Sequence, residues 1–371
     1  MALALASRAE GRTSPNPMVG AVVVRRGRVV GRGYHHRAGG PHAEVLALEQ
    51  AGSAAAGATL ILNLEPCCHY GKTPPCTDAI IQARVARVVA GMRDPNPRVD
   101  GGGFEALRAA GIEVEVGVLE EACKRFNEEY VHFITTGRPF VILKLAASLD
   151  GRIATAKGAS KWITGERARR HVHRLRSRVD AVMVGAGTVR ADDPSLTVRL
   201  DDSPARNPAR VVVDSALGIS PRAKVFSARA QARVIVATTP RASAKNERRV
   251  AATGATVVRV RARRGRVDLA ALLARLAKLG ITSVLVEGGS ELATALWRAQ
   301  LVDKLMLFLA PCILGGDAVP AFGALEIPTL AQAVRLERAH VHRLDDDVLI
   351  EAFPAARRPA RARPPRRKGS H

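Results

Sequence analysis

Three of the five cysteines in this chain lie within ten residues, in the segment EPCCHYGKTPPC at residues 65–76. Cys67 and Cys76 each follow a proline, and upstream His42 and Glu44 stand two residues apart where a helical pattern begins. One histidine and two cysteines are the donors of a zinc site whose fourth position stays open for water. Zinc lowers the pKa of that water, and a carboxylate beside the metal, here Glu44, can carry its proton. These residues predict a metal-assisted hydrolytic site.

The order of these residues is similar to the signature H-x-E…P-C-x-x-C of zinc nucleobase deaminases, with one departure. Eight residues separate Cys67 from Cys76 where two are usual. A purely structural zinc site would need a fourth protein ligand, which Cys68 or His69 could supply. Cys68 is instead expected to pack, because it points away when its neighbour Cys67 points toward the metal. A catalytic zinc with Glu44 as proton shuttle is the favoured interpretation.

The pattern of apolar residues predicts the elements that hold this site. It indicates a hairpin at 21–34 around Arg26-Gly27, helices at 42–51, 76–86, 104–111 and 120–137, and strands at 59–64, 87–92 and 112–118. These segments form one α/β unit, so His42 and Cys76 are expected at helix starts and Cys67 just after a strand. Arg138-Pro139 follows this unit, and the first domain is placed at residues 1–139.

A second α/β pattern begins at residue 140. Buried strands are expected at 180–185, 210–215, 233–238, 283–289, 304–311 and 348–353, with the last closing the sheet. The second domain is placed at residues 140–355, and residues 356–371 are expected to form a disordered basic tail. We expect no membrane span, because no apolar run is long enough, and no signal peptide, because the first residues lack its basic segment. A cytoplasmic protein with reduced cysteines is therefore expected.

The formal net charge of +23 raises the question of nucleic-acid binding. Much of the excess is concentrated, since residues 357–371 contain six arginines and one lysine without an acid, and residues 241–266 contain nine basic residues against one glutamate. Aromatic residues make up only 4% of the chain, so few are available to stack on bases. We expect no nucleic-acid partner and interpret the charge as solvated surface that also suits a phosphorylated small molecule. An RNA-binding deaminase and a non-catalytic zinc scaffold are the competing interpretations.

Glycines mark two candidate phosphate-binding turns in the second half. In VGAGTVRADDP, residues 184–194, Gly185 and Gly187 follow a predicted strand, but the third glycine of the dinucleotide-binding fingerprint is absent. Gly288 and Gly289 are better placed, between a predicted strand and a predicted helix. Backbone N–H groups at such a helix start favour a phosphate group.

Long motifs in both halves resemble the bifunctional riboflavin-biosynthesis deaminase/reductase family. PNPMVGAVVV, PHAEVLAL, LEPCCHYGKTPPC and RDPNP are similar to its deaminase half, in which the long gap between the two cysteines is usual. LKLAASLDGRIA, SKWITG, HRLRSRVDAVMVGAGTVRADDPSLTVR and VEGGSEL are similar to its reductase half. The resemblance covers nearly all of the chain except the tail. It implies an α/β protein with an N-terminal cytidine-deaminase-like three-layer domain and a C-terminal dihydrofolate-reductase-like domain.

The resemblance also implies two reactions on one phosphorylated pyrimidine. The first is zinc-dependent hydrolytic deamination of 2,5-diamino-6-(ribosylamino)pyrimidin-4-one 5′-phosphate. The second is NADPH-dependent reduction of the ribosyl chain, which gives 5-amino-6-(5-phosphoribitylamino)uracil. One zinc ion and NADPH are the implied cofactors, and a homo-oligomer is left open.

Further site residues follow from the resemblance position by position. In the first half it implies that three residues contact the substrate: Asn16, His69 and Lys72. In the second half it implies cofactor contacts for Ala146, Trp162, Thr188, Asp192, Gly289 and Ser290. It implies substrate contacts for Lys144, Ser160, Arg176, Leu196, Arg199 and Glu287, with the two arginines suited to a phosphate. Lys144 could equally be an ordinary strand-end lysine, Trp162 could pack in the core, and Asp192 could cap a helix or turn.

Overall fold

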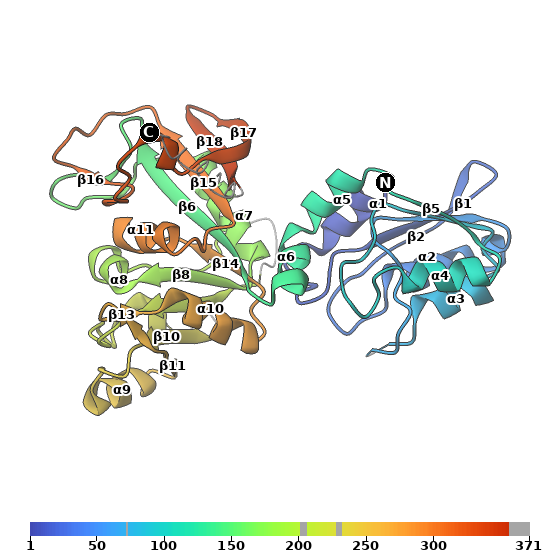
Figure 1. Ribbon diagram of the computed structural model, residues 1–371, viewed down its shortest axis with the longest axis horizontal. Helices are drawn as coiled ribbons and strands as arrows, with labels where there is room; N and C mark the ends of the chain where they lie inside the picture. Colours follow the sequence, from blue (N-terminus) through green and yellow to red (C-terminus); the bar gives the residue numbers. More distant parts are fainter. Residues whose placement is uncertain (72, 201–205, 228–231, 356–371) are drawn as a thin grey trace, which may run out of the picture.

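The computed structural model describes residues 1–71, 73–200, 206–227 and 232–355. Lys72 and the tail at 356–371, both subjects of predictions above, lie outside the described residues. The described chain forms two lobes, each built on its own β-sheet, and helix α6, Glu128–Thr136, lies between them (Figure 1). The expected boundary at residue 139 falls between α6 and the first strand of the second sheet, β6 at Phe140–Ser148.

The N-terminal lobe contains a five-stranded sheet with the order β2-β1-β3-β4-β5. Its strands are β1 Gly20–Arg25, β2 Arg28–Tyr34, β3 Thr59–Leu62, β4 Arg87–Ala90 and β5 Glu113–Val116. β1 runs antiparallel to β2 and β3, whereas β3, β4 and β5 are parallel. The predicted hairpin is confirmed, since Arg26 and Gly27 have φ angles of 48° and 74°, the positive values that a two-residue turn of this kind requires.

Helices cover both faces of this sheet, which confirms the predicted three-layer arrangement (Figure 1). One face carries α2 Ala43–Ala51, α3 Cys76–Gln82 and α4 Gly102–Ala109, and the other carries α1 Ala2–Ala6 and α5 Glu120–Phe126. Side chains alternate along β1, so Ala21 and Val23 pack toward α2 while Val22 packs toward α1. Gly33 in β2 permits the close approach of α2, because a Cβ there would lie 2.3 Å from the Ala43 carbonyl oxygen.

The segment 120–137, expected to be one helix, is two helices that break at Asn127. Asn127 is buried, and its side chain binds the backbone of Met18: Oδ1 accepts from the Met18 N–H at 2.9 Å and Nδ2 donates to the Met18 carbonyl at 3.0 Å. The backbone of Asn127 leaves the helical conformation there, with φ −108° and ψ 27°. The single-helix prediction is wrong at this residue, since local propensity carries no information about a tertiary partner.

The C-terminal lobe contains a nine-stranded sheet with the order β11-β10-β9-β8-β14-β6-β15-β18-β17. Besides β6, the strands are β8 Ala181–Gly185, β9 Ala209–Val213, β10 Val234–Thr238, β11 Thr256–Arg259, β14 Ser283–Val286, β15 Lys304–Ala310, β17 Leu336–Leu344 and β18 Asp347–Pro354. The strands from β11 to β15 are parallel, and β18 is antiparallel to both of its neighbours. The α/β class predicted for this half is confirmed.

Helices also cover both faces of the second sheet. α7 Glu166–Arg178, α8 Ala186–Asp192 and α9 Ala244–Ala251 pack on one face, and α10 Leu269–Lys278 and α11 Ser290–Arg298 on the other. Two small ribbons pair β7 Arg152–Ala154 with β16 Val319–Pro320 and β12 Ala262–Arg263 with β13 Arg266–Val267. Short 3-10 helices occur in both lobes at Ser7–Ala9, Gly52–Ala55, Lys224–Phe226 and Leu330–Gln332.

Strand β17 forms one edge of the large sheet, beyond the strand expected to close it. The expected strand at 348–353 is present as β18, but it pairs with β15 on one side and β17 on the other. Every residue of β17 except Leu344 is exposed. A strand exposed on both faces lacks the apolar alternation by which strands are recognised, so the sequence did not indicate it.

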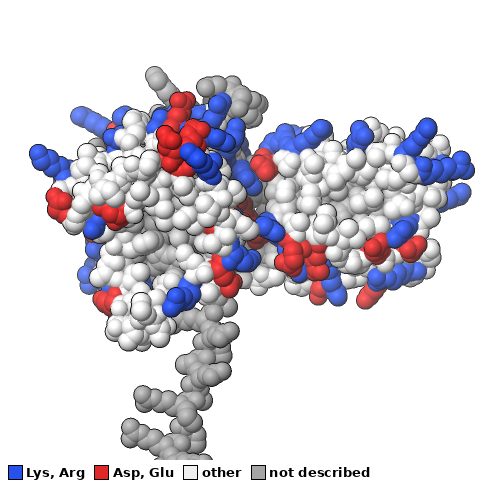
Figure 2. All heavy atoms as spheres, turned by 90° about the horizontal axis from the view of Figure 1, so that it is seen from above, with Lys and Arg blue, Asp and Glu red and all other residues white. Residues whose placement is uncertain are grey.

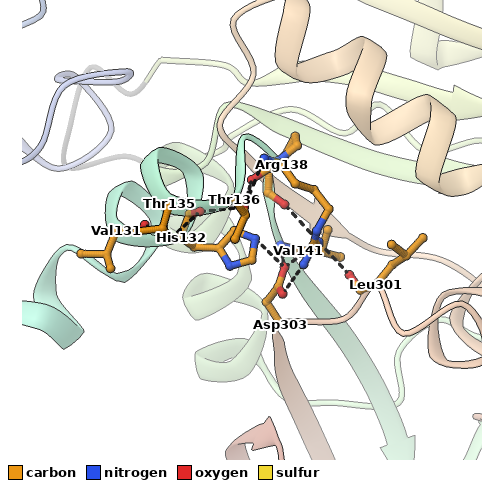
Figure 3. Close-up of polar contacts among 9 residues, drawn as sticks. Val131, His132, Thr135, Thr136, Arg138, Val141, Leu301 and Asp303 are labelled. Carbon is orange, nitrogen blue, oxygen red and sulfur yellow. Dashed lines mark hydrogen bonds and ion pairs between the residues drawn. The ribbon is translucent and has the colours of Figure 1, made fainter. Parts of the chain in front are cut away.

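A polar cluster fixes the segment between the two lobes (Figure 3). Arg138 donates from Nη1 to Asp303 Oδ2 at 2.9 Å and from Nη2 to Oδ1 at 2.6 Å. Asp303 Oδ2 also accepts the Val141 N–H at 2.8 Å, and His132 Nε2 of α6 lies 3.6 Å from the same oxygen. Asp303 directly precedes β15, so one carboxylate connects α6, the linker and the second sheet.

Charged side chains of both signs are interspersed over the face of both lobes shown in Figure 2. Exposed ion pairs occur in each lobe, such as Arg87 with Glu113 at 3.2 Å and Arg298 with Glu326 at 2.6 Å. Pairs of this kind contribute little to stability, because water screens them. In the described parts of the chain, no helix has the length and apolar character needed to cross a membrane.

Candidate active sites

The three predicted metal ligands lie at the ends of elements that the first sheet aligns. His42 is the N-cap of α2, Cys76 is the first residue of α3, and Cys67 lies in the loop after β3. His42 Nδ1 is 3.1 Å from Cys76 Sγ and 3.6 Å from Cys67 Sγ. Among the described residues, these form the one group of three or more His, Cys, Asp or Glu side chains whose donor atoms all lie within 4.8 Å of one another.

The chemistry of this donor set fits a zinc ion. A hydrogen bond from Cys76, followed by one from His42, lowers the pKa of Cys67, and the same bond between the thiols raises the pKa of Cys76. The two sulfurs lie within 4.8 Å of each other, and a divalent cation bound by both would displace thiol protons, since binding of a metal to thiols releases protons. Two sulfurs and one imidazole occupy three of four tetrahedral positions, as in catalytic zinc sites.

Glu44 lies in the first turn of α2, two residues after His42, and is 3% exposed. Burial raises the pKa of its carboxyl group, and the nearby His42 partly opposes this effect. A buried carboxyl group with a raised pKa can both accept and return a proton. Its position and its protonation chemistry agree with the predicted shuttle.

The two alternative ligands, Cys68 and His69, do not join the cluster. Cys68 Sγ lies 3.9 Å from the Arg98 carbonyl oxygen and faces the start of α4, where a Cβ on Gly102 would be 3.1 Å from it. His69 Nδ1 is buried and has no hydrogen-bond partner in the described part of the chain. Because buried polar atoms normally have partners, this nitrogen is suited to a bound ligand.

Asn16 is connected to the metal cluster through contacts with His35. Asn16 Nδ2 lies 3.1 Å from His35 Nε2, and His35 Nδ1 lies 2.9 Å from the carbonyl oxygen of Pro41, the residue before His42. The His35 and His42 rings meet edge to face, with centroids 5.3 Å apart. The structure therefore places the predicted substrate residue Asn16 beside the metal ligands, although Asn16 and His42 are far apart in sequence.

Glu65 is a site residue that the sequence analysis missed. It is 3% exposed, and its carboxylate accepts four backbone hydrogen bonds at 3.0–3.2 Å, from the N–H groups of Asp94, Gly101, Gly103 and Phe104. These bonds fasten the segment before Cys67 to the start of α4. Glu65 directly precedes Pro66-Cys67, but its burial comes from the tertiary structure, so the sequence carried no signal that backbone donors would surround this acid.

The second site is a cavity of about 650 Å³ at the carboxyl ends of the parallel strands β6, β8 and β14. This edge is where ligands bind in parallel α/β sheets. Eleven of the twelve residues predicted for the second half line it, namely Lys144, Ala146, Ser160, Trp162, Arg176, Thr188, Asp192, Leu196, Arg199, Glu287 and Gly289. Ser290, the first residue of α11, is not among the lining residues.

Arg176 and Glu287 form a two-point ion pair in this cavity, and Arg176 Nη1 donates to the Thr197 carbonyl at 2.9 Å. Burial alone would raise the pKa of Glu287, but the charge and hydrogen bonds of Arg176 lower it. Burial lowers the pKa of Lys144, while Glu287 opposes this. Lys144 Nζ also lies 5.6 Å from the centre of the Phe308 ring. The two arginines predicted to bind a phosphate therefore differ. The Arg176 side chain is already paired with Glu287, whereas the Arg199 side chain is exposed.

Trp162 lies at the surface of the cavity rather than in the core, with 68% of its surface exposed. The Arg169 guanidinium lies 4.7 Å from the centre of its ring. Ser160 Oγ donates to Asp192 Oδ1 at 2.8 Å, and Lys161 Nζ donates to the Asp192 carbonyl at 3.0 Å. Asp192 is the last residue of α8 and joins these segments across the cavity.

The turn at Gly289 is tied to α8, because the Gly289 N–H donates to Thr188 Oγ1 at 3.2 Å. Gly289 is the N-cap of α11, so N–H groups of the first turn of this helix lie next to the cavity. Such groups attract anions. The weak glycine pattern in 184–194 and the turn at Gly289 therefore belong to one site.

Two further cavity residues were missed, Arg169 and His173 on α7. Both lie on the same helix face as Val172 and Arg176, at spacings of three and four residues. Counting back from Arg176 by three and then four residues along the predicted helix would therefore have identified both residues.

Comparisons with known proteins find matches for both halves of the chain. Residues 1–92 match the family described as the cytidine and deoxycytidylate deaminase zinc-binding region, and residues 139–350 match the RibD C-terminal domain. The chain is 42% identical over 350 residues to the riboflavin biosynthesis protein RibD of Aquifex aeolicus, covering 94% of this chain and 96% of that protein. It is 41% identical over 360 residues to the RibD protein of Escherichia coli, covering 94% and 96%.

Solved structures give the same result. The structure of Acinetobacter baumannii RibD, form 1, is similar with a TM-score of 0.86 and 39% identity over 96% of this chain and 97% of that chain. A diaminohydroxyphosphoribosylaminopyrimidine deaminase/5-amino-6-(5-phosphoribosylamino)uracil reductase from Thermotoga maritima is similar with a TM-score of 0.81 and 40% identity, over 95% and 97% of the two chains.

Proposed function

Because this chain belongs to the family of RibD riboflavin-biosynthesis proteins, with a zinc-binding deaminase region and a reductase domain, we propose that it catalyses two consecutive reactions. The first removes ammonia from 2,5-diamino-6-(ribosylamino)pyrimidin-4-one 5′-phosphate, and the second reduces the ribosyl chain of the product with NADPH. The observation that carries this proposal is the presence of two sites in one chain, the His42–Cys67–Cys76 cluster beside buried Glu44 and the large cavity of the second lobe. The proposed division is 1–139 for deamination and 140–355 for reduction.

In the deaminase site His42, Cys67 and Cys76 would hold zinc, and the bound metal would supply Lewis-acid activation of water. Glu44 accepts a proton from the attacking water and delivers it to the pyrimidine ring and the departing ammonia. Its burial beside the ligands supports this role. Asn16, His69 and Lys72 are proposed to bind the pyrimidine or its phosphate, and the unpartnered His69 Nδ1 supports such a contact.

NADPH bound in the reductase site would supply the hydride for the sugar. Ala146, Trp162, Thr188, Asp192, Gly289 and Ser290 are proposed to bind the cofactor. Lys144, Ser160, Arg176, Leu196, Arg199 and Glu287 are proposed to bind and orient the substrate. Exposure of the Trp162 ring in the cavity supports a stacking role, and the α11 start at Gly289 supports binding of a phosphate group.

Three further features complete the proposal. The substrate is a small phosphorylated pyrimidine and not a nucleic acid, and membership of the riboflavin-biosynthesis family supports this. A cytoplasmic location is supported by the five cysteines, none of which forms a disulfide with another. A homo-oligomer is compatible with this function.

Mass spectrometry of the diaminopyrimidinone phosphate incubated with the enzyme tests the proposal. A product in which an amino group is replaced by oxygen is expected without NADPH, and a further gain of two hydrogens with NADPH. An unchanged substrate under both conditions would exclude this function. Reduction without prior deamination would reverse the proposed order.

A further inference from the structure

His173 lines the cavity of the second lobe from the middle of α7. Arg169, Val172 and Arg176 face the same cavity, so His173 belongs to the helix stripe that forms one wall. His173 is half-buried. None of the residue roles described so far uses its imidazole, although it stands between residues proposed to bind substrate.

The hydrogen bonding of His173 defines its tautomer. Its Nδ1 accepts the backbone N–H of Arg199 at 3.2 Å. A ring nitrogen that accepts carries no proton, so the proton of the neutral imidazole lies on Nε2. Burial, and then the charges of Arg176 and Arg199, lower the pKa of His173 to about 4, which keeps the ring neutral. Nε2–H is therefore the one N–H group with which this neutral ring can donate.

The same wall holds the backbone segment that carries Arg199. Arg176 Nη1 donates to the Thr197 carbonyl, and His173 accepts from Arg199 two residues later. Two side chains of α7 therefore fix the position from which the Arg199 guanidinium enters the cavity. A phosphate group is bound best by donors that are held in place. Holding the backbone of Arg199 therefore helps to position its guanidinium group for a phosphate.

Of the other cations that line the cavity, Lys144 has its Nζ over the Phe308 ring and Arg169 donates to the Thr164 carbonyl. The remaining three also have partners. Arg176 is paired with Glu287, Lys224 lies 3.5 Å from Asp193, and Lys161 donates to a backbone carbonyl. Arg199 is exposed, and no acid among the described residues pairs with its side chain. An anionic group entering this end of the cavity therefore meets Arg199 and the neighbouring imidazole of His173.

We propose that His173 is a further substrate-recognition residue of the reductase site. Through Nδ1 it positions the backbone of Arg199, and through Nε2–H it donates, together with the Arg199 guanidinium, to the phosphate of the ribosylaminopyrimidine substrate. This inference rests on the proposed function and extends it, because it assigns the phosphate end of the cavity to Arg199 and His173 rather than to two arginines.

Two substitutions separate the two parts of this role. His173→Asn keeps an acceptor oxygen at the position of Nδ1 but removes the donor at Nε2. His173→Gln keeps a donor near the position of Nε2 but removes the acceptor. His171→Asn, on the same helix, is the matched control, because His171 packs on Phe308 and does not line the cavity.

Steady-state reduction is measured with the deaminated substrate and with its dephosphorylated form. We expect His173→Asn to raise KM for the phosphorylated substrate about tenfold, the effect of losing one hydrogen bond to a charged group, with kcat retained. KM for the dephosphorylated form should not change. His173→Gln should also raise KM for the phosphorylated form, and both variants should weaken competitive inhibition by inorganic phosphate.

An unchanged KM in His173→Asn, or an equal rise in KM for both substrate forms, would overturn the role in phosphate binding. Loss of kcat alone would place His173 in a different step and would equally overturn it. Wild-type enzyme that reduces neither substrate form would instead refute the proposed function itself.

Discussion

Arg176 donates two parallel hydrogen bonds to Glu287, from Nε to Oε1 at 2.6 Å and from Nη2 to Oε2 at 2.9 Å. Both side chains are only 12% exposed. The pair joins α7 to the carboxyl end of β14 and forms part of the cavity wall. Removal of either partner leaves a buried charge without compensation, which costs about 3–5 kcal/mol.

Arg176→Ala should therefore impair reduction and leave deamination intact. The free energy of unfolding of the second lobe should fall, and reduction should be slower at every substrate concentration, because Glu287 and the Thr197 segment lose their partner. Kinetics of each reaction with separate substrates check this. Arg174→Ala, an exposed arginine on the same helix, should match the wild type, and equal damage to both reactions would contradict two separate sites.

Glu44→Gln should retain zinc and lose deamination by a factor of about 10²–10⁴, the usual contribution of a positioned proton carrier. The amide preserves the shape of the side chain but cannot accept and return a proton. Metal analysis should give the same zinc content as the wild type, and reduction of pre-deaminated substrate should continue. Deamination at the wild-type rate would show that another group carries the proton.

Glu65→Gln should weaken zinc retention as well as stability. The backbone N–H groups that donate to the Glu65 carboxylate would then face the N–H₂ group of the glutamine, which is itself a donor. Hydrogen bonds to a charged group contribute about 1.5–3 kcal/mol each. Zinc should leave faster in a chelator competition, and because bound metal stabilises the folded state, chelation should lower the melting temperature. Glu49→Gln, an exposed acid on α2, is the control. Unchanged zinc release would limit Glu65 to a structural role.

Asp94 should make the free energy of unfolding fall as the pH rises, the opposite of the usual effect of an acidic residue. Burial raises the pKa of Asp94 to about 6, above the value of about 3.9 in an unfolded chain. The folded state therefore binds more protons between about pH 4 and 6, so this contribution to stability is present at low pH and is lost as pH rises through 6. Asp94→Asn keeps the oxygen that accepts from Tyr130 and from the Asn96 N–H.

Urea unfolding of wild type and Asp94→Asn at pH values from 5 to 8 measures this effect. The stability of the variant relative to the wild type should increase with pH and level off above 7, with a total change of about 1.4 kcal/mol over this range, because about one unit of the pKa shift lies above pH 5. A difference that is constant over this range would show that Asp94 titrates normally.

Local chemistry determined much of the deaminase site in advance. His42, Glu44, Cys67 and Cys76 were recognised because few other arrangements use one histidine, two cysteines and a nearby acid at starts and ends of elements. The hairpin at Arg26-Gly27 and the buried strands were also evident, because turn chemistry and apolar runs are local properties. The individual substrate and cofactor contacts of the second lobe remain predictions, although eleven of them line one cavity.

The remaining features depend on contacts between residues distant in sequence. Asn127 breaks a helix because it binds Met18, and Glu65 is a buried acid because four backbone N–H groups from another segment surround it. The pairing of Arg176 with Glu287 and the hydrogen bond from Arg199 to His173 have the same origin. The sequence by itself determined which groups can do the chemistry. Only the tertiary structure decided which of them are engaged with one another, because burial and hydrogen-bond partners are set by the packing of the whole fold.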